Sequence, residues 1–184
     1  EEVLHALPEM GGGKPVFGAI SPNARVPALE LSDVVIAESL AICEWAAEQN
    51  PALWPKGTSD RALARSAASI MHSGFPNLRN DAPMNIRRRT DAGRMTPAGL
   101  DDAAKVDELW SGWLKRSGGP FLFGEYSVAD AMYAPVITRF VTYAIPRSAE
   151  AQGYIDRMVA EPHMAAWIAA AEKETRTLPR SDIA

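Results

Sequence analysis

Residues 25–42, RVPALELSDVVIAESLAI, form the stretch that decides the fold of this chain. Two apolar runs, residues 25–31 and 34–37, flank a Ser-Asp pair, and this pattern predicts a β-hairpin. Val26-Pro27 lies at the entrance to the first run, and we expect its peptide bond to be cis. Only about 5–6% of X-Pro bonds in folded proteins are cis, and they typically hold tight turns. Such a turn exposes the N–H and C=O of Val26, which can pair with an extended peptide as a strand edge does.

A helix is predicted to begin at Glu38-Ser39, because apolar residues then recur at helical spacing through residue 49. The first turn of a helix carries unpaired N–H groups and a partial positive charge. The N–H and hydroxyl of Ser39 can therefore receive a carboxylate while Glu38 pairs with an ammonium, which together fit an α-amino acid head group. The alternative from these residues alone is an ordinary helix start in which Ser39 caps its own helix.

Helical signals replace strand signals beyond a short Pro- and Gly-containing linker at residues 54–57. A helix is expected from Asp60 to about Phe75, and the prolines that follow should kink or break it. Apolar residues at helical spacing predict another helix around residues 103–114. A last helix should begin near Pro162.

Ser127 and Asp130 have the spacing of a capping box, so a helix should follow them. The residues after them are so apolar that this helix is expected at the centre of its domain. The alternation of polar and apolar residues over positions 1–7 is typical of a half-buried strand. We therefore predict an α/β domain over residues 1–52 and an all-helical domain over residues 57–184.

Composition excludes several classes of function. The formal net charge is −4 and the pI is near 5.4, and these values argue against nucleic-acid binding, which requires a basic face. One cysteine rules out an internal disulfide framework, and no apolar stretch approaches the ~20 residues of a membrane span. The patterns of zinc proteases, phosphate loops and serine hydrolases are absent, so no metal is expected. We expect a reducing cytoplasm as the location.

Two separated motifs carry a resemblance to a known family. Residues 21–31, SPNARVPALEL, followed by residues 38–42, ESLAI, resemble the glutathione-binding half of glutathione transferases of bacterial type. Residues 121–124, FLFG, and 127–135, SVADAMYAP, are similar to the core helix of that family's C-terminal domain. The resemblance implies a thioredoxin-like first domain, an all-helical second domain, and glutathione as cosubstrate. It also implies a hydrophobic electrophile as the second substrate, and a homodimer.

The resemblance assigns roles to particular residues. Glutathione would contact Val26, Pro27, Glu38 and Ser39, and Arg25 would pair with the carboxylate at the other end of the tripeptide. The pocket for the hydrophobic substrate would include three residues of the helical domain: Met71, His72 and Phe75.

Each of these assignments has a structural alternative. Arg25 can be a solvated cation at a strand edge, and His72 can be an ordinary core or surface histidine. Cys43 lies on the apolar stripe of its helix, where a lone cysteine is usually inert packing. Asp130 is expected to stabilise the fold rather than to act in catalysis.

The resemblance further implies that the chain begins at the second strand of the thioredoxin-like domain. The residue that stabilises the glutathione thiolate in this family follows the first strand, so the catalytic residue is not assigned. Two function classes remain: an enzyme that delivers the glutathione thiolate to an electrophile, by conjugation, isomerisation or reductive dehalogenation, and a non-catalytic binding or carrier protein.

Overall fold

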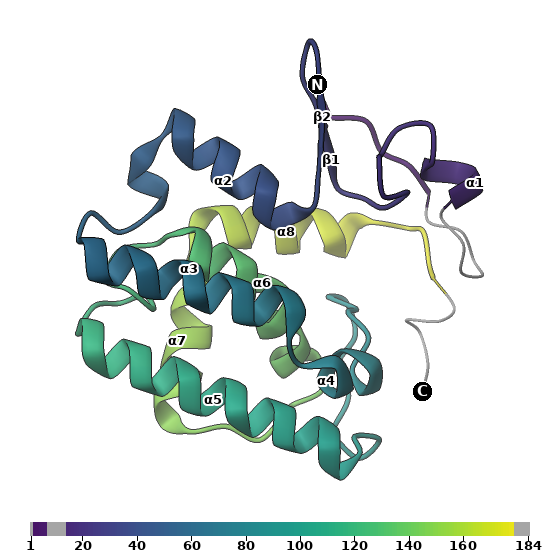
Figure 1. Cartoon of the computed structure of the whole chain (residues 1–184). Helices are drawn as coiled ribbons and strands as arrows, with labels where there is room; N and C mark the ends of the chain where they lie inside the picture. Colours follow the sequence, from purple (N-terminus) through teal and green to yellow (C-terminus); the bar gives the residue numbers. More distant parts are fainter. Residues whose placement is uncertain (1, 7–13, 179–184) are drawn as a thin grey trace.

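The computed structural model describes residues 2–6 and 14–178 of the chain (Figure 1). Its elements are α1 (Lys14–Phe17), β1 (Ala28–Glu30), β2 (Val35–Ala37), α2 (Ser39–Gln49), the 3₁₀ helix η1 (Pro51–Leu53), α3 (Thr58–Ser73), α4 (Pro76–Asp81), α5 (Pro97–Ser117), α6 (Val128–Thr142), α7 (Ala149–Ala160) and α8 (Pro162–Lys173).

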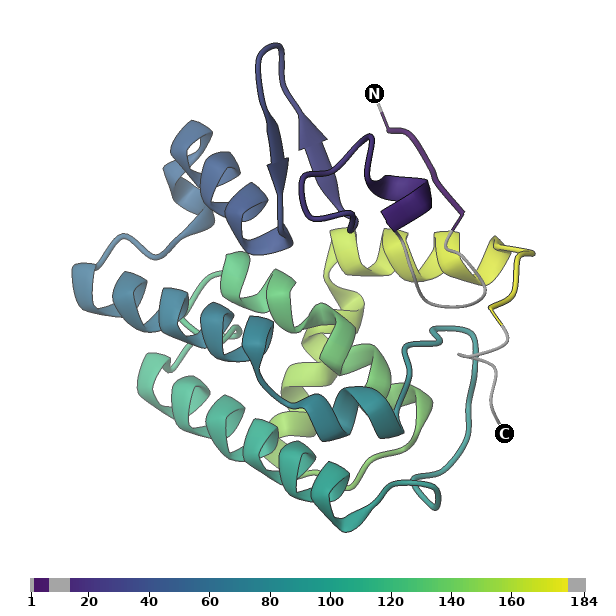
Figure 2. The ribbon, with the colours of Figure 1, turned by 45° about the vertical axis from the view of Figure 1, so that its right-hand side comes forward.

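The hairpin predicted from residues 25–37 is confirmed. Strands β1 and β2 pair antiparallel, with Leu29 opposite Ile36, and the N–H of Leu31 donates to the carbonyl of Val34 across the turn. The hairpin lies at one end of the molecule, above α2 and α8 (Figure 2). The Val26-Pro27 peptide bond is cis, as expected.

The strand expected at residues 1–7 is wrong for the part that the structure describes. Residues 2–6 form no strand, and all five are exposed, including Val3 and Leu4 at 67% and 69%. A β-strand in a sheet is stabilised by backbone hydrogen bonds to a neighbouring strand. Within the described residues the sheet contains β1 and β2 alone, so the alternating pattern has no partner there.

In the described residues beyond 57, the regular elements are all helices, apart from an isolated bridge between Phe121 and Gly124, and α6 runs through the centre of this body (Figure 1). Ten of its residues are buried, as the apolar sequence indicated. The capping box is also confirmed, since Ser127 N–H donates to the Asp130 carboxylate at 3.0 Å. The helix predicted from Asp60 to Phe75 is α3, which ends at Ser73, before Pro76 begins α4.

Aromatic side chains from three helices form the centre of the core. Trp110 of α5 contacts Tyr133 and Phe140 of α6 and Tyr154 of α7, with ring centroids 5.2 to 5.7 Å apart. These aromatic contacts fix α5, α6 and α7 relative to one another. The sequence reasoning did not locate α7, although its buried residues follow a regular helical spacing.

Candidate functional site

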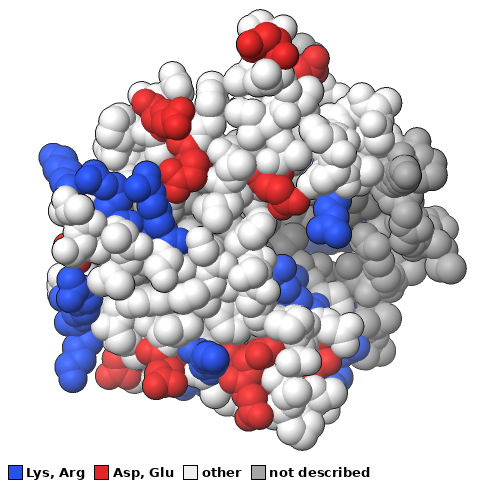
Figure 3. Space-filling view, viewed as in Figure 1, with Lys and Arg blue, Asp and Glu red and all other residues white. Residues whose placement is uncertain are grey.

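A cavity of about 510 Å³ lies where the N-terminal part meets the helical body. One wall comes from residues 23–27 and the start of α2, and the other from α3, α4 and α6. Figure 3 shows acidic and basic atoms around a hollow on this face of the molecule. The lining residues are Asn23, Arg25, Val26, Pro27, Glu38, Ser39, Cys43, Met71, His72, Arg79, Ala131, Met132 and Pro135.

Val26 brings an unpaired peptide group to the wall of this cavity. It lies before the first paired residue of β1, and no hydrogen bond within the described part of the chain uses its N–H or C=O. Its side chain is 42% exposed. Both backbone groups are thus open to an extended ligand, which can pair with them as a further strand would.

Glu38 stands at the junction of β2 and α2 in an uncommon backbone conformation. Its φ is 73° and its ψ is 124°, a region that non-glycine residues rarely adopt. It occupies the N-cap position of α2, yet its side chain does not cap the helix. Instead the carboxylate is turned toward the cavity, where Oε1 accepts a 2.6 Å hydrogen bond from Asn23 and Oε2 lies 3.5 Å from His72 Nε2. Backbone strain of this kind is frequently found at ligand sites.

Asn23 organises the turn that precedes the cis peptide bond. Its Oδ1 accepts hydrogen bonds from the hydroxyl of Ser21, at 2.8 Å, and from the N–H of Arg25, at 3.1 Å. Because these two hydrogen bonds hold the oxygen of the side-chain amide, the nitrogen of the same amide faces Glu38. The sequence reasoning missed Asn23; an Asn two residues before Arg25 is the local signal of an Asx turn.

Ser39 is the first helical residue of α2 and lies inside the helix rather than at its N-cap. The alternative in which Ser39 caps its own helix is therefore wrong, because the cap position belongs to Glu38. The N–H of Ser39 is one of the donors that the first helical turn leaves unpaired, and the residue lines the cavity. A carboxylate placed here would meet both this donor and the positive end of the helix.

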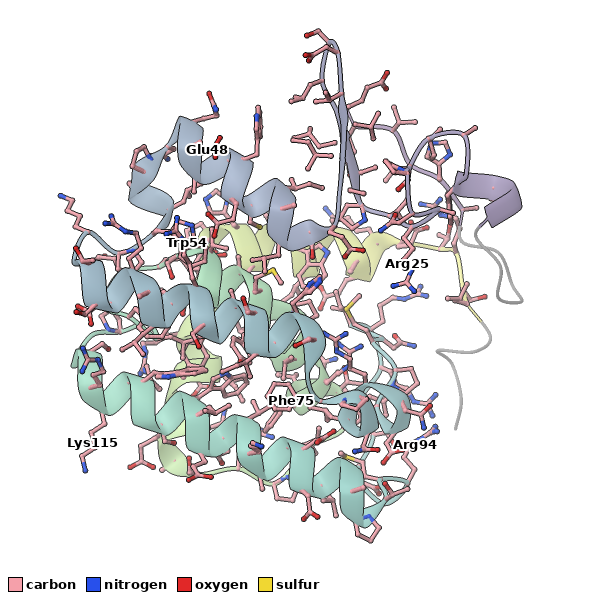
Figure 4. All side chains as sticks on the ribbon, in the orientation of Figure 1. Arg25, Glu48, Trp54, Phe75, Arg94 and Lys115 are labelled. Atoms are coloured by element: carbon pink, nitrogen blue, oxygen red, sulfur yellow. The ribbon has the colours of Figure 1, made fainter. Side chains whose placement is uncertain are left out.

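Arg25 lies on the side of the N-terminal part that faces α4 (Figure 4). It is exposed, and within the described residues its guanidinium forms no ion pair. The side chain of Lys14, at the start of α1, lies outside the described part of the structure.

The helical wall differs in part from the expectation. Met71 and His72 of α3 line the cavity, but Phe75 does not. The chain turns at Phe75 with a φ of 59°, and its ring, 5% exposed, packs into the core of the helical body (Figure 4). Pro76 must begin a new helix there, and the reversal that this requires carries the ring inward.

Arg79 of α4 is a lining residue that the sequence reasoning missed. Its Nη2 donates to the carbonyls of Met71 and His72, at 2.7 and 3.3 Å, in the last turn of α3. These contacts satisfy carbonyls that a helix end leaves without partners, and they hold α3 against α4. A guanidinium at this point also makes the helical wall partly cationic.

Cys43 lines the cavity one turn after Ser39. Burial and the neighbouring charge of Glu44 raise the pKa of its thiol. A raised thiol pKa lowers the fraction of thiolate, which is the nucleophilic form, so these contacts support packing rather than covalent chemistry for Cys43.

Two further findings concern metals and membranes. Among the described residues, His, Cys, Asp and Glu side chains form no group of three or more that could hold a metal ion. The helices of the same part of the chain include none with the length and apolar character needed to cross a bilayer.

The N-terminal part combines a hairpin, a cis-proline turn and the start of a helix, and the turn and the helix start face a helical body. This arrangement matches a known family of two-domain proteins. Residues 2–49 match the N-terminal domain of glutathione S-transferases, and residues 96–170 match the C-terminal domain of the same family. The chain belongs to the glutathione S-transferase family.

Similar curated proteins include some named as glutathione S-transferases and some named as isomerases. Glutathione S-transferase 1 of Dianthus caryophyllus is 32% identical over 132 residues, which cover 70% of this chain and 60% of that protein. Maleylacetoacetate isomerase of Rattus norvegicus is 25% identical over 135 residues, which cover 72% of this chain and 61% of that protein. The chain thus spans about three fifths of the length of these relatives.

A solved structure confirms the fold. The theta class glutathione S-transferase of Xanthomonas axonopodis pv. citri, solved with glutathione bound, superposes with a TM-score of 0.64 at 24% identity. The match covers 91% of this chain and 81% of that one. The fold is therefore that of glutathione transferases, with a small two-stranded sheet and helices followed by an all-helical domain.

Proposed function

We propose that this protein is a glutathione transferase, which binds glutathione in the cavity and delivers its thiolate to an electrophilic small molecule. The observation that carries the proposal is the convergence of three groups on one cavity: the unpaired peptide group of Val26, the carboxylate of Glu38 and the first helical turn at Ser39. Membership of the family and glutathione-bound structures of similar fold support it.

The tripeptide has a group for each of these contacts. In the proposed pose its ammonium pairs with Glu38, and the adjacent carboxylate meets the N–H and hydroxyl of Ser39 at the positive end of α2. The backbone of the cysteinyl residue pairs with Val26, next to Pro27. The glycyl carboxylate at the far end is placed at Arg25, which supplies a planar donor pair for it.

The electrophile is placed against the helical wall. Met71, Met132 and Pro135 give this wall its apolar character, and His72 lies beside them.

A free thiol has a pKa near ~8.5 and is only a few per cent thiolate at neutral pH, so a transferase must stabilise the anion. Relatives named maleylacetoacetate isomerase and maleylpyruvate isomerase favour thiol-assisted isomerisation among the possible reactions.

Activity with and without glutathione tests the proposal. The intact protein is assayed against a panel that contains electrophiles for conjugation, a cis-alkene acid for isomerisation and an aryl halide for dehalogenation. The proposal predicts turnover of at least one substrate that depends on glutathione. Glutathione binding without turnover of any class would instead support the second function, a non-catalytic binding or carrier protein.

We also propose a cytoplasmic homodimer. The family resemblance supports the dimer, and so do exposed apolar side chains on the N-terminal part, such as Val34 at 50% and Val16 at 46%. Sedimentation at micromolar concentration should give twice the chain mass, and a monomer at every concentration would contradict the proposal.

A further inference from the structure

We propose that His72 determines how strongly the site binds the ammonium group of its ligand, because its proton competes with that ammonium for Glu38. The inference rests on the proposed glutathione site and adds a role for a residue of the helical domain. Nε2 of His72 lies 3.5 Å from Oε2 of Glu38, and both side chains line the cavity. The contact joins α3 to the start of α2, so it spans the two parts of the chain.

The carboxylate of Glu38 has two oxygens with different neighbours. Oε1 receives the amide of Asn23, and Oε2 faces the imidazole of His72. An ionised carboxylate has about four lone-pair sites, so it can accept from Asn23, from a neutral imidazole and from an ammonium together. A protonated imidazole changes the balance, because two positive charges then share one carboxylate at close range.

Among the described residues that line the cavity, no second anion relieves this competition. Glu38 is the one carboxylate among the lining residues. The other ionisable groups that face the cavity are Arg25, from the segment before β1, Cys43, from α2, and Arg79, from α4. The side chains that α6 contributes are uncharged. A proton on His72 therefore adds a cation to a cavity that already holds two guanidinium groups.

Histidine side chains ordinarily change charge between pH 5 and 8, whereas carboxylic acids do so at lower pH and ammonium groups at higher pH. Of the three kinds of group that meet at the Glu38–ammonium contact, an imidazole is therefore the one whose charge ordinarily varies in this window. A positive charge on the imidazole beside Glu38 reduces the benefit that a ligand gains from its ammonium, so the proposal predicts that this benefit decreases as the pH falls.

Two tripeptides isolate this benefit. S-methylglutathione carries the ammonium and has no thiol that could ionise, and its deamino analogue, in which hydrogen replaces the ammonium, is otherwise identical. The ratio of their affinities, measured by calorimetry on the full chain, reports the ammonium contact alone, because effects of pH on the two carboxylates cancel. The ratio should increase about fivefold from pH 5.5 to pH 8, the factor that one unit charge about 4 Å away produces in water.

Substitutions at position 72 fix the charge. His72→Gln keeps a neutral donor and should hold the ratio at its high value throughout, whereas His72→Lys should hold it at its low value. His163→Gln on α8, an exposed position that does not line the cavity, should retain the wild-type dependence. A ratio that is independent of pH in the wild type, or a dependence that persists in His72→Gln, would overturn the role of His72 while leaving the glutathione site intact. Failure of both tripeptides to bind at every pH would overturn the site itself, and the inference with it.

Discussion

The side-chain amide of Asn23 donates a 2.6 Å hydrogen bond to Oε1 of Glu38, and this bond ties the turn before Pro27 to the start of α2. We expect Asn23→Ala to weaken glutathione binding about three- to tenfold, because the Glu38 carboxylate loses the contact that orients it. Asn23→Asp, nearly identical in shape, should weaken it further, since two carboxylates would then face each other. Calorimetry on both variants checks this order, and equal affinities for the two would contradict it.

Arg25 should act on one end of the tripeptide only. If its guanidinium pairs with the glycyl carboxylate, Arg25→Ala should weaken glutathione binding by about 1–3 kcal/mol. The same variant should bind γ-glutamylcysteine, which lacks the glycine, as well as the wild type does. Lys115→Ala on α5 removes a charge far from the cavity (Figure 4) and serves as the control. Equal losses for both peptides would show that Arg25 acts through the general field of the cavity.

Asp130 should be needed for stability. Burial raises the pKa of its carboxyl, although donors from Leu122, Ser127 and Tyr154 all point at it. Asp130→Ala leaves these buried donors without an acceptor, so we expect a loss of about 3 kcal/mol in the free energy of unfolding. Urea denaturation measures it. The exposed Asp101→Ala should change the same free energy by less than about 0.5 kcal/mol.

Asp81 should make stability depend on acid pH. The hydroxyl and N–H of Thr96 donate to its carboxylate at 2.6 and 2.9 Å and hold the pKa of this buried group below its usual value. A lowered pKa gives stability that is present above the unfolded-state pKa, near ~3.9, and is lost as the pH falls through the folded-state pKa. Asp81→Asn should thus be less stable than the wild type at pH 7, and the difference should shrink below about pH 4. A difference that stays constant across this range would contradict the assignment.

Local features of the fold could be predicted from the sequence. The hairpin, the cis bond at Val26-Pro27 and the start of α2 each depend on a few neighbouring residues, and the structure has all three. Helix α7 was missed although its signal is local: Ala151, Tyr154, Ile155 and Met158 are buried at helical spacing. Reading those positions for periodicity would have found it.

Features that depend on distant segments could not be predicted. The strand expected at residues 1–7 needs a partner that no local pattern supplies, and Phe75 turns inward because of how α3 and α4 meet. In the same way, the contacts that Glu38 makes with Asn23 and His72 join segments whose approach is set by tertiary packing. The site residues singled out from the sequence, except Phe75, thus line one cavity, whereas the contacts that orient Glu38 could not be predicted.

The central claim is that the first turn of α2 receives a carboxylate of glutathione, and the most direct test is calorimetric titration of wild-type and Ser39→Ala protein with glutathione. Thermal unfolding of both proteins serves as the control for an intact fold. The claim predicts that the wild type binds and that Ser39→Ala loses about 1–3 kcal/mol, or about 5- to 150-fold in affinity, since a hydrogen bond to a charged group is removed. Equal affinities of the two folded proteins for glutathione would contradict it.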